Sequence, residues 1–415
     1  MRVAFVVGEF PLLSESFVLN QITGLIDRGH QVDIYAERRG GRGHPDVDRY
    51  GLLSRARFEN MPASRVWRAL ALPGRLAAAA PAPAAVAGAL SPRRHGLQAL
   101  SLRLLYQALP FVRAGRYDAV HAHFGANGCR AAAMLELGLL SGPLITSFHG
   151  ADIMAYPRQR GRDVYAPLFA RGAWFLPVSD RWNAELVRLG CPADRIRVHR
   201  MGVDCERFRP AADIEAPRGE LRVISVARLV PKKGLEYALD ALALVGVRGR
   251  DATLAIAGAG PERGRLEDRA RGLGLSDRVT WLGPVSHDRL PEVLAGADVF
   301  LAPSVTPPDG DIEGVPVAII EAMASGLPVV ATSHGAIPDL VSDQVTGLLA
   351  AERDAPGLAE RIERLAADPT LRKRLGAAGR ACVEREFEIG RLNDALVELY
   401  RTFPPACASR APALY

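Results

Sequence analysis

Residues 313–330 read Glu-Gly-Val-Pro-Val-Ala-Ile-Ile-Glu-Ala-Met-Ala-Ser-Gly-Leu-Pro-Val-Val, a helical pattern that runs into a buried strand. Pro316 suits the first helical position, and Gly326 suits the left-handed position just past the last turn. The sequence therefore predicts a helix over Pro316–Ser325. A capped helix followed directly by an apolar strand is a repeating unit of open α/β sheets.

The two glutamates of this stretch suit a site for a sugar nucleotide. Glu313 lies at the mouth of the predicted helix, and Glu321 lies inside it, roughly two turns away. The helix start offers unpaired N–H groups and a positive dipole end to an anion, and the carboxylates can accept hydrogen bonds from hydroxyls. A phosphate together with a polyol indicates a sugar nucleotide. The alternative for this stretch alone is a capped amphipathic helix with Glu321 on a solvated face.

A second cluster, Ser225-Val-Ala-Arg-Leu-Val-Pro-Lys-Lys-Gly234, follows an apolar run from Leu221 and precedes a predicted helix from Leu235. It places Arg228 and Lys233 at a strand-to-helix turn. Ligands bind at strand ends in open α/β sheets, and an arginine beside a lysine can neutralise a diphosphate. The alternative is a solvated basic turn.

Together the two stretches resemble the family-four retaining glycosyltransferases, whose carboxy-terminal domains carry an Arg-Leu…Lys-Gly turn and two glutamates separated by seven residues. The first half of the chain resembles the subgroup that builds exopolysaccharides such as colanic acid. The matching segments there are Phe10–Gln21, His121–Gly125, Ser147–Asp152 and Gly202–Asp204. Only about 40–116 and the tail after Thr402 fall outside the resemblance.

Short apolar runs alternate with helical patterns along the chain, which predicts parallel sheets with helices on both faces. Strands are expected in the first half at Val3–Val7, Val32–Tyr35, Ala119–Ala122, Leu144–Ser147, Trp174–Val178 and Ile196–His199. Strands are expected in the second half at Arg222–Val226, Thr253–Ala257, Val279–Leu282, Val299–Ala302, Val329–Ala331 and Leu348–Leu349.

The polar, proline-bearing stretch Arg207–Gly219 is predicted to link two domains and to act as the hinge of their closure. The resemblance implies the GT-B arrangement, in which two doubly wound Rossmann-like domains face each other across a cleft. We expect an acceptor-binding domain over 1–210 and a sugar-nucleotide domain over 211–388. Residues 389–415 are expected to form a helix and tail that return to the first domain.

The resemblance also implies roles for individual residues. Arg228 and Lys233, with the N–H groups of Gly314 and Val315, would stabilise the charge that grows on the leaving diphosphate, in place of a metal ion. Glu313 would hold hydroxyls of the donor sugar.

Further contacts are implied around these residues. Glu321 would hold the ribose, and the backbone from Gly283 to Val285 would meet the base. His149 matches a position over the donor sugar, where it would supply hydrogen bonding and electrostatics; the alternative is a structural histidine. We therefore predict His149, Glu313, Arg228 and Lys233 as catalytic residues. The acceptor side is predicted at Ser14, Glu15 and Ser16.

The resemblance implies a metal-independent hexosyltransferase that retains the anomeric configuration. Uridine and guanosine donors both fit it, and a UDP-sugar is favoured over a GDP-sugar. The nucleotide sugar is a co-substrate, and no cofactor is expected. The acceptor is left open between a glycan, a lipid-linked sugar and a small aglycone. The alternatives are a sugar-nucleotide epimerase, which would need no acceptor, and a non-catalytic sugar-nucleotide-binding protein.

Composition sets further limits. A chain of 415 residues with 48% hydrophobic residues can form two cores. Its five cysteines are scattered and odd in number, which indicates a reducing compartment and no structural metal. No signal peptide is evident, and no apolar run reaches the ~18 residues of a membrane span. A cytoplasmic protein is therefore expected.

Three further motifs have simpler interpretations. Gly258-Ala-Gly260 follows an apolar strand, but it lacks the third glycine of a dinucleotide site and fits a core turn. Asp309-Gly-Asp311 could hold a metal, but it fits a loop turn. His121-Ala-His123 places two imidazoles on one face of a strand without an evident third metal ligand.

The segment 61–117 is strongly basic. It contains eight arginines and no acidic residue, so its charge of +8 exceeds the net +6 of the chain. Apolar residues between the arginines allow basic amphipathic helices, which suit anionic membrane surfaces or polyanionic acceptors. A peripheral contact with the inner face of the membrane and an ordinary arginine-rich surface both stay open. Nucleic acid is not expected, because no recognition motif accompanies the charge.

Overall fold

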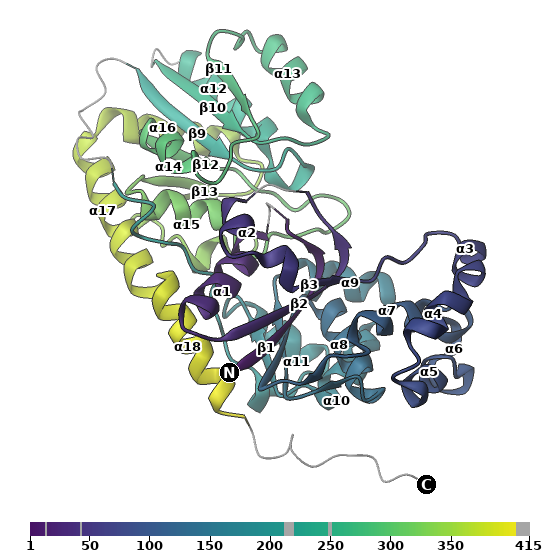
Figure 1. Cartoon of the computed structure of the whole chain (residues 1–415). Coiled ribbons are helices and arrows are strands. Elements are labelled where there is room, and N and C mark those ends of the chain that lie inside the picture. Colours follow the sequence, from purple (N-terminus) through teal and green to yellow (C-terminus); the bar gives the residue numbers. More distant parts are fainter. Residues whose placement is uncertain (13–14, 42–43, 211–219, 248–250, 404–415) are drawn as a thin grey trace.

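The computed structural model describes residues 1–12, 15–41, 44–210, 220–247 and 251–403 (Figure 1). The described chain forms two α/β domains, each built on a six-stranded parallel sheet. The predicted pair of doubly wound domains is thereby confirmed. Part of the predicted hinge, 211–219, lies outside the described residues.

The amino-terminal sheet has the strand order β3-β2-β1-β5-β7-β8. Its strands are β1 Arg2–Phe10, β2 Gln31–Arg39, β3 Ala56–Phe58, β5 Ala119–His123, β7 Leu144–Phe148 and β8 Trp174–Pro177. A separate two-stranded sheet joins β4 Gly115–Arg116 and β6 Leu140–Ser141. The central strand β1 is the core of the domain, since Val3–Val7 are at most 1% exposed. Burial on both faces explains why this strand reads as a continuous apolar run.

The predicted strand Ile196–His199 is wrong. Ile196 forms only an isolated bridge with Phe175, and the N–H groups of Arg197 and His199 donate to β8. Pro177, the acceptor for His199, has no N–H to donate in return. The ladder therefore stops at the edge of β8.

The carboxy-terminal sheet has the order β11-β10-β9-β12-β13-β14. Its strands are β9 Leu221–Val226, β10 Ala252–Ala257, β11 Val279–Gly283, β12 Val299–Ala302, β13 Val329–Thr332 and β14 Gly347–Ala350. Its helices are α12 Leu235–Val247, α13 Arg263–Gly272, α14 Leu290–Ala295, α15 Val317–Ala324, α16 Ala355–Ala367 and α17 Pro369–Glu386.

Helix α15 is one residue shorter at each end than the predicted Pro316–Ser325. Pro316 is its N-cap, with an extended ψ of 105°, rather than its first helical residue. Gly326 has a φ of 73° and occupies the left-handed position beyond the helix, as predicted. The extended backbone of Pro316 turns the chain where α15 begins, three residues after Glu313.

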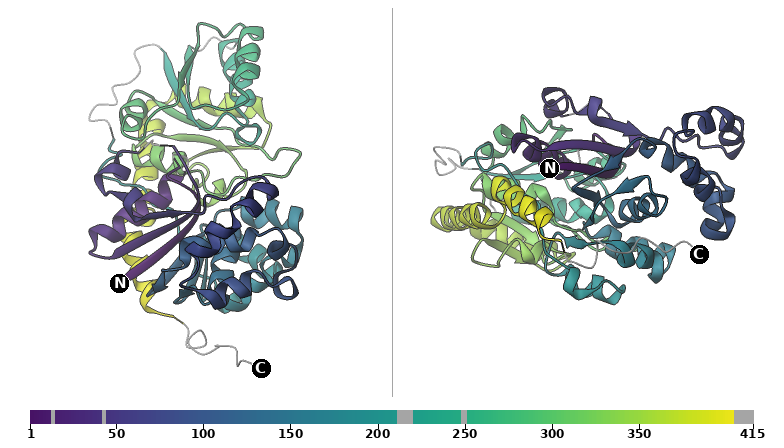
Figure 2. Two further views of the ribbon diagram at one scale, coloured as in Figure 1. Left: turned by 45° about the vertical axis from the view of Figure 1, so that its right-hand side comes forward. Right: turned by 60° about the horizontal axis from the view of Figure 1, so that its bottom comes forward.

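The other helices of the amino-terminal domain cover its sheet. They are α1 Ser16–Asp27, α2 Pro45–Arg49, α8 Gly125–Glu136, α9 Ala151–Arg160, α10 Ala166–Arg171 and α11 Trp182–Arg188. A helical lobe projects from this domain on the side opposite α1 (Figures 1 and 2). It contains α3 Arg65–Leu70, α4 Leu72–Ala78, α5 Pro83–Ala89 and α6 Pro92–Leu100, which α7 Arg103–Ala108 joins to the core.

The last helix, α18 Ile389–Arg401, continues from α17 and runs along α1 of the other domain (Figure 1). Nε of Arg28 lies 2.7 Å from Asp394, and its NH2 donates to the carbonyl of Gly390 at 2.7 Å. At the other end of α18, the Tyr400 hydroxyl contacts Nδ1 of the buried His121 at 2.6 Å. The chain therefore joins the two domains twice, at about residue 210 and again before α18.

Candidate active site

Three loops of the carboxy-terminal domain converge where its strands end. Residues 227–234 follow β9, residues 303–316 follow β12 and residues 333–336 follow β13. They converge because β9, β12 and β13 are neighbours and parallel strands end at one edge of the sheet. Gly234, with a φ of 59°, lets the first loop pass directly over the carbonyl of Pro303, which a Cβ would overlap.

Glu313 and two lysines form an ion cluster in these loops. Nζ of Lys233 lies 2.8 Å from Oε2 of Glu313, and Nζ of Lys232 lies 3.6 Å from Oε1. Lys232 also lies 3.0 Å from Oδ2 of Asp311. Burial acts to raise the pKa of Glu313, but Lys233 and then Lys232 outweigh it and hold the pKa below its ordinary value. This buried carboxylate is therefore ionised and can accept hydrogen bonds from hydroxyls.

The backbone of Glu313 is held by a buried histidine. Its N–H donates to Nε2 of His334 at 3.0 Å, and Nδ1 of that ring lies 2.8 Å from Oε1 of Glu352. Because a carboxylate only accepts, the proton belongs on Nδ1 and Nε2 is the acceptor. Thr306 donates its N–H to Oε2 of the same carboxylate at 2.7 Å. The ring thus fixes the segment that carries Glu313.

The mouth of α15 meets the other domain backbone to backbone. A Cβ on Gly314 would overlap the carbonyl oxygen of His149, and a Cβ on Gly150 would come 2.7 Å from the Cα of Gly314. Within the described part of the chain, the N–H groups of Gly314 and Val315 make no backbone hydrogen bond. Two donors and the positive end of the helix dipole are therefore available to an anion at this junction.

Arg228 provides a further cation on the loop of the two lysines. It is exposed, and it forms no ion pair with any described residue. Burial and then Glu9 raise the pKa of Glu15 in the other domain, and the charge of Arg228 acts to lower it. Arg228 is therefore placed between the domains and is available to a diphosphate.

His287 links Glu321 to the segment that carries Gly283 and Val285, the residues predicted to contact the nucleoside. Glu321 is 5% exposed, and its Oε1 lies 3.2 Å from Nε2 of His287. Gly283, which ends β11 with a φ of 66°, and Val285 precede His287 on the same segment. The ring of His287 in turn lies 5.1 Å from the ring of His44 in the amino-terminal domain.

His149 follows β7 and packs against the rings of Phe17 and Phe124, at centroid distances of 4.6 and 4.5 Å. Its Nε2 lies 3.1 Å from Nδ1 of His123, and its buried Nδ1 has no partner among the described residues. Burial lowers the pKa of His149 to about 3. The ring is therefore neutral at physiological pH and can hydrogen-bond to a hydroxyl without carrying charge.

Asp152 holds the backbone on which His149 is carried. Its Oδ1 accepts the N–H groups of His149 and Gly150 at 2.8 and 3.0 Å, and its Oδ2 accepts the N–H of Gly125 at 3.0 Å. The Tyr165 hydroxyl donates to the Asp152 carbonyl at 2.6 Å. These bonds fix the strand end that meets Gly314.

The residues predicted for the acceptor side differ in their surroundings. Ser14 lies outside the described residues, and Ser16 is 9% exposed at the start of α1. Glu15 lines a small pocket with Glu9 and His44. Burial and then Glu9 raise the pKa of Glu15 to about 7, although Arg228 acts to lower it. Of the described residues on the predicted acceptor side, Glu15 can therefore change its charge near neutral pH.

Asp309 and Asp311, considered above as a possible metal-binding pair, lie in a loop where each already has a protein partner. Oδ1 of Asp309 accepts the N–H of Asp311 at 3.0 Å, and Asp311 pairs with Lys232. No group of three metal-ligating side chains is found in the described ranges.

Gly258 and Gly260 belong to a turn packed on the β9 loop. A Cβ on Gly258 would overlap the carbonyl of Ala227, and a Cβ on Gly260 would overlap that of Leu229. The glycines therefore serve close backbone packing.

His121 and His123 lie on one face of β5, as alternation predicted, with ring centroids 4.6 Å apart. Nδ1 of His121 contacts Tyr400 and its Nε2 contacts the Ser147 hydroxyl at 2.8 Å, so both nitrogens have partners. The sequence did not reveal that His149 joins this row of rings.

Sequence reasoning missed the roles of Glu352, Asp152, His287 and His334. Asp152 entered only as the end of the segment Ser147–Asp152 that carries the resemblance. The doublet Lys232–Lys233 was a visible sign of a cluster, but no local pattern links Glu352 to Glu313, 39 positions earlier in the chain.

Comparisons with known proteins agree with the two-domain organisation. A family model described as Glycosyltransferase Family 4 matches residues 14–207, and one described as Glycosyl transferases group 1 matches residues 209–381. The chain is 38% identical over 422 aligned residues to a putative colanic acid biosynthesis glycosyltransferase, WcaL, of Salmonella typhimurium, covering 97% of this chain and 100% of the relative.

Two further similarities cover nearly the whole chain. The amylovoran biosynthesis glycosyltransferase AmsK of Erwinia amylovora is 37% identical, with 93% of this chain and 96% of the relative aligned. The crystal structure of HepE of Anabaena in complex with UDP superposes with a TM-score of 0.71 at 19% identity, over 97% of this chain and all of that one. The latter comparison supports the fold.

Proposed function

The chain belongs to glycosyltransferase family 4, and from that membership we propose that it transfers a hexose from a nucleoside-diphosphate sugar to an acceptor hydroxyl with retention of configuration. The observation that carries this proposal is the buried, ionised Glu313 held between Lys232 and Lys233 beside the mouth of α15. This cluster offers carboxylate oxygens that accept hydrogen bonds from sugar hydroxyls. It also offers cations and N–H donors that can bind a diphosphate.

The proposed step breaks the anomeric C–O bond of the donor while the acceptor oxygen bonds to the same carbon and face. The acceptor proton passes to the leaving diphosphate. Arg228, Lys233 and the free N–H groups of Gly314 and Val315 stabilise the charge that grows on this leaving group. Lys233 and the two N–H groups are held in position before the donor binds, so they need little reorganisation in the transition state.

Glu313 and His149 approach the reaction centre from opposite domains. The carboxylate of Glu313 accepts donor-sugar hydroxyls, and the neutral ring of His149 contributes a hydrogen bond. Glu321 takes the ribose and the backbone from Gly283 to Val285 takes the base. The close approach of Gly314 to the His149 carbonyl joins the two domains beside these groups.

A panel of UDP- and GDP-sugars tests this proposal. Thermal shift and slow donor hydrolysis are measured for the wild type, Glu313→Gln and Arg228→Ala. We expect one UDP-sugar to stabilise the wild type and to be hydrolysed, and we expect both variants to lose hydrolysis. Failure of every sugar nucleotide to bind would contradict the proposal. Binding with release of an epimerised sugar and no transfer would favour the epimerase alternative.

The metal, anomeric and acceptor assignments need separate measurements. The protein cations meet the diphosphate charge in this proposal, so EDTA should leave turnover unchanged; activity restored only by Mn²⁺ or Mg²⁺ would contradict it. NMR of the product gives its anomeric configuration, and an inverted configuration would contradict the proposed retention. The names of the relatives favour an exopolysaccharide intermediate over a small aglycone as acceptor.

The four described cysteines are free thiols, which agrees with a cytoplasmic reaction.

A further inference from the structure

The helical lobe α3–α6 exposes an unusual concentration of apolar side chains. Val66, Trp67 and Leu70 on α3 are 66, 65 and 64% exposed, and Leu97 and Leu100 on α6 are 82 and 67% exposed. Among the described residues these five are the large apolar side chains that are more than 60% exposed. A folded domain does not present such side chains together without a contact for them.

This exposure belongs to an ordered structure. The guanidinium of Arg68 donates to the carbonyls of Pro62, Ala63 and Ser101 at 2.7, 3.1 and 3.3 Å. The Tyr106 hydroxyl donates to the Arg68 carbonyl at 2.9 Å. These bonds tie α3 to the end of α6 and to α7. Helix α3 is therefore held against the end of α6 and α7, with Trp67 and its neighbours in solvent.

The two helices that carry these apolar side chains also carry exposed cations. Arg65 on α3 and Arg93 and Arg94 on α6 are exposed and form no ion pair with described residues. The whole segment 61–117 contains no acidic residue that could neutralise them. Exposed tryptophan, leucine and unpaired arginine on one small lobe suit the interface of a bilayer, where apolar groups enter the headgroup layer and arginine meets lipid phosphate.

We propose that the α3–α6 lobe docks on the surface of an anionic lipid bilayer. Charge complementarity favours anionic lipid, and the exposed tryptophan and leucines favour a bilayer over a purely polar polyanion. No helix in the described ranges is long and apolar enough to span the membrane, so the contact is interfacial. The lobe projects from the amino-terminal domain on the side opposite α18, so it can contact a flat surface without obstruction by α18 (Figures 1 and 2). This docking does not depend on which donor the enzyme uses.

Vesicle flotation tests the proposal on the full chain. Phosphatidylcholine vesicles are compared with vesicles that also contain phosphatidylglycerol. We expect the wild type to float with the anionic vesicles and to be released by high salt. The pair Trp67→Ser and Leu97→Ser, which leaves the charge unchanged, should lower binding by ~10-fold or more because two exposed apolar side chains no longer enter the interface.

A charge variant and matched controls separate the two contributions. Arg93→Glu with Arg94→Glu should abolish the preference for anionic vesicles. Val345→Ser, at a site 57% exposed in the other domain, and Arg374→Glu, exposed on α17, should bind as the wild type does. Donor hydrolysis should be the same in every variant, since none of these residues lies near Glu313. Failure of the proposed function would therefore leave the docking result unaffected.

Insertion itself can be followed through Trp67. Brominated lipid should quench the wild-type fluorescence, and this quenching should be absent in Trp67→Phe. Equal vesicle binding by the wild type and the Trp67→Ser, Leu97→Ser pair would overturn the proposal. So would binding to soluble polyphosphate without binding to vesicles, since that result would identify a polyanionic partner instead.

Discussion

Nδ1 of His334 lies 2.8 Å from Oε1 of Glu352, while the opposite nitrogen of the ring accepts the N–H of Glu313. The imidazole is fully buried. Its Nδ1 faces an acceptor, the Glu352 carboxylate, and its Nε2 faces a donor, the Glu313 N–H. Glu352 therefore sets the tautomer of His334, and the tautomer sets whether the Glu313 backbone is held.

Replacing Glu352 should disturb catalysis through this histidine. In Glu352→Gln the side-chain amide can donate to Nδ1, which would move the proton to Nε2 and oppose the Glu313 N–H. We expect kcat for donor hydrolysis to fall ~10-fold or more with a smaller change in KM, because one positioning hydrogen bond is lost. Glu292→Gln, at an exposed site whose side chain pairs with no described residue, is the control. An unchanged kcat would show that the bond does not position Glu313.

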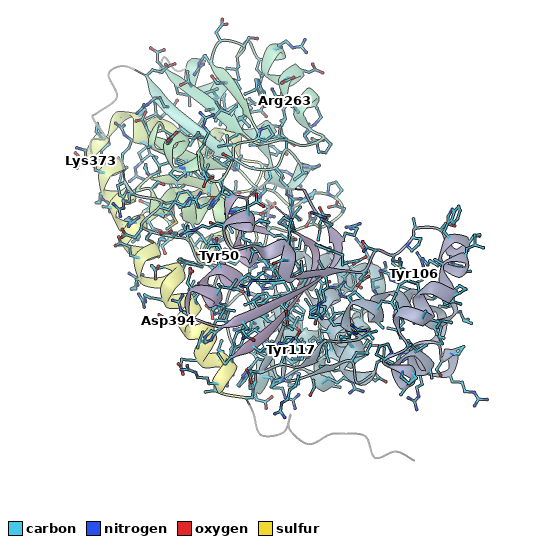
Figure 3. All side chains as sticks on the ribbon, viewed as in Figure 1. Tyr50, Tyr106, Tyr117, Arg263, Lys373 and Asp394 are labelled. Carbon is cyan, nitrogen blue, oxygen red and sulfur yellow. The ribbon has the colours of Figure 1, made fainter. Side chains whose placement is uncertain are left out.

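Removing the charge of Lys233 should affect turnover more than folding. Glu313 keeps Lys232 at 3.6 Å, so the buried carboxylate of Lys233→Met is still compensated. We expect donor hydrolysis to fall ~100-fold or more, since a preorganised cation is lost from the leaving group. The chain contains only one other lysine, the exposed Lys373 on α17, and Lys373→Met is the matched control (Figure 3). Similar turnover in both variants would contradict the role of Lys233.

Glu15 should make stability depend on pH in a defined direction. Burial and Glu9 raise its pKa to about 7 in the folded protein, against about 4.3 in an unfolded chain. Between these values the folded state binds the additional proton, so this contribution to stability falls as pH rises and is lost by about pH 7. Glu15→Gln cannot ionise. The melting temperature of this variant minus that of the wild type should therefore increase from pH 5 to about pH 7 and then level off.

The control for this pH effect is Glu292→Gln, which changes an exposed glutamate in the other domain. Its melting temperature should follow that of the wild type at each pH. A Glu15→Gln difference that stays constant from pH 5 to 8 would show that Glu15 does not titrate in this window.

A methyl group at Gly314 should hold the domains apart. The Cβ of Gly314→Ala would overlap the carbonyl oxygen of His149, whereas the Cβ of Gly264→Ala in α13 would meet no atom within 4 Å. We expect Gly314→Ala to fold but to lose most donor hydrolysis, and its radius of gyration by X-ray scattering should increase relative to Gly264→Ala. Full activity in Gly314→Ala would show that this contact is not needed for turnover.

The hydroxyl of Tyr400 should contribute to the docking of α18. It contacts Nδ1 of His121 at 2.6 Å inside the core, so Tyr400→Phe leaves a buried ring nitrogen without a partner. We expect a loss of ~1–3 kcal/mol in the free energy of unfolding. Tyr50→Phe, which removes a hydroxyl bonded to Asp27 at the surface, should cost less (Figure 3). Equal losses measured by denaturant unfolding would contradict this account.

The sequence by itself determined the fold and the positions of the main motifs. Continuous apolar runs such as Val3–Val7 can be satisfied only by strands buried on both faces, and Gly326 ends its helix because glycine adopts the left-handed conformation at little cost. These are properties of neighbouring residues. The strand predicted at Ile196–His199 failed because its pairing depended on Pro177, a residue from another segment.

The tertiary structure alone decided which side chains meet and in which charge state. Lys233 and Glu313 are 80 positions apart and become partners because β9 and β12 are neighbours in the sheet. His149 is neutral because the rings around it exclude water, which a motif cannot express. Packing likewise leaves Trp67 in solvent while it buries Tyr106 in the same basic segment. Local sequence sets the conformation of each element, whereas burial and long-range contacts set its chemistry.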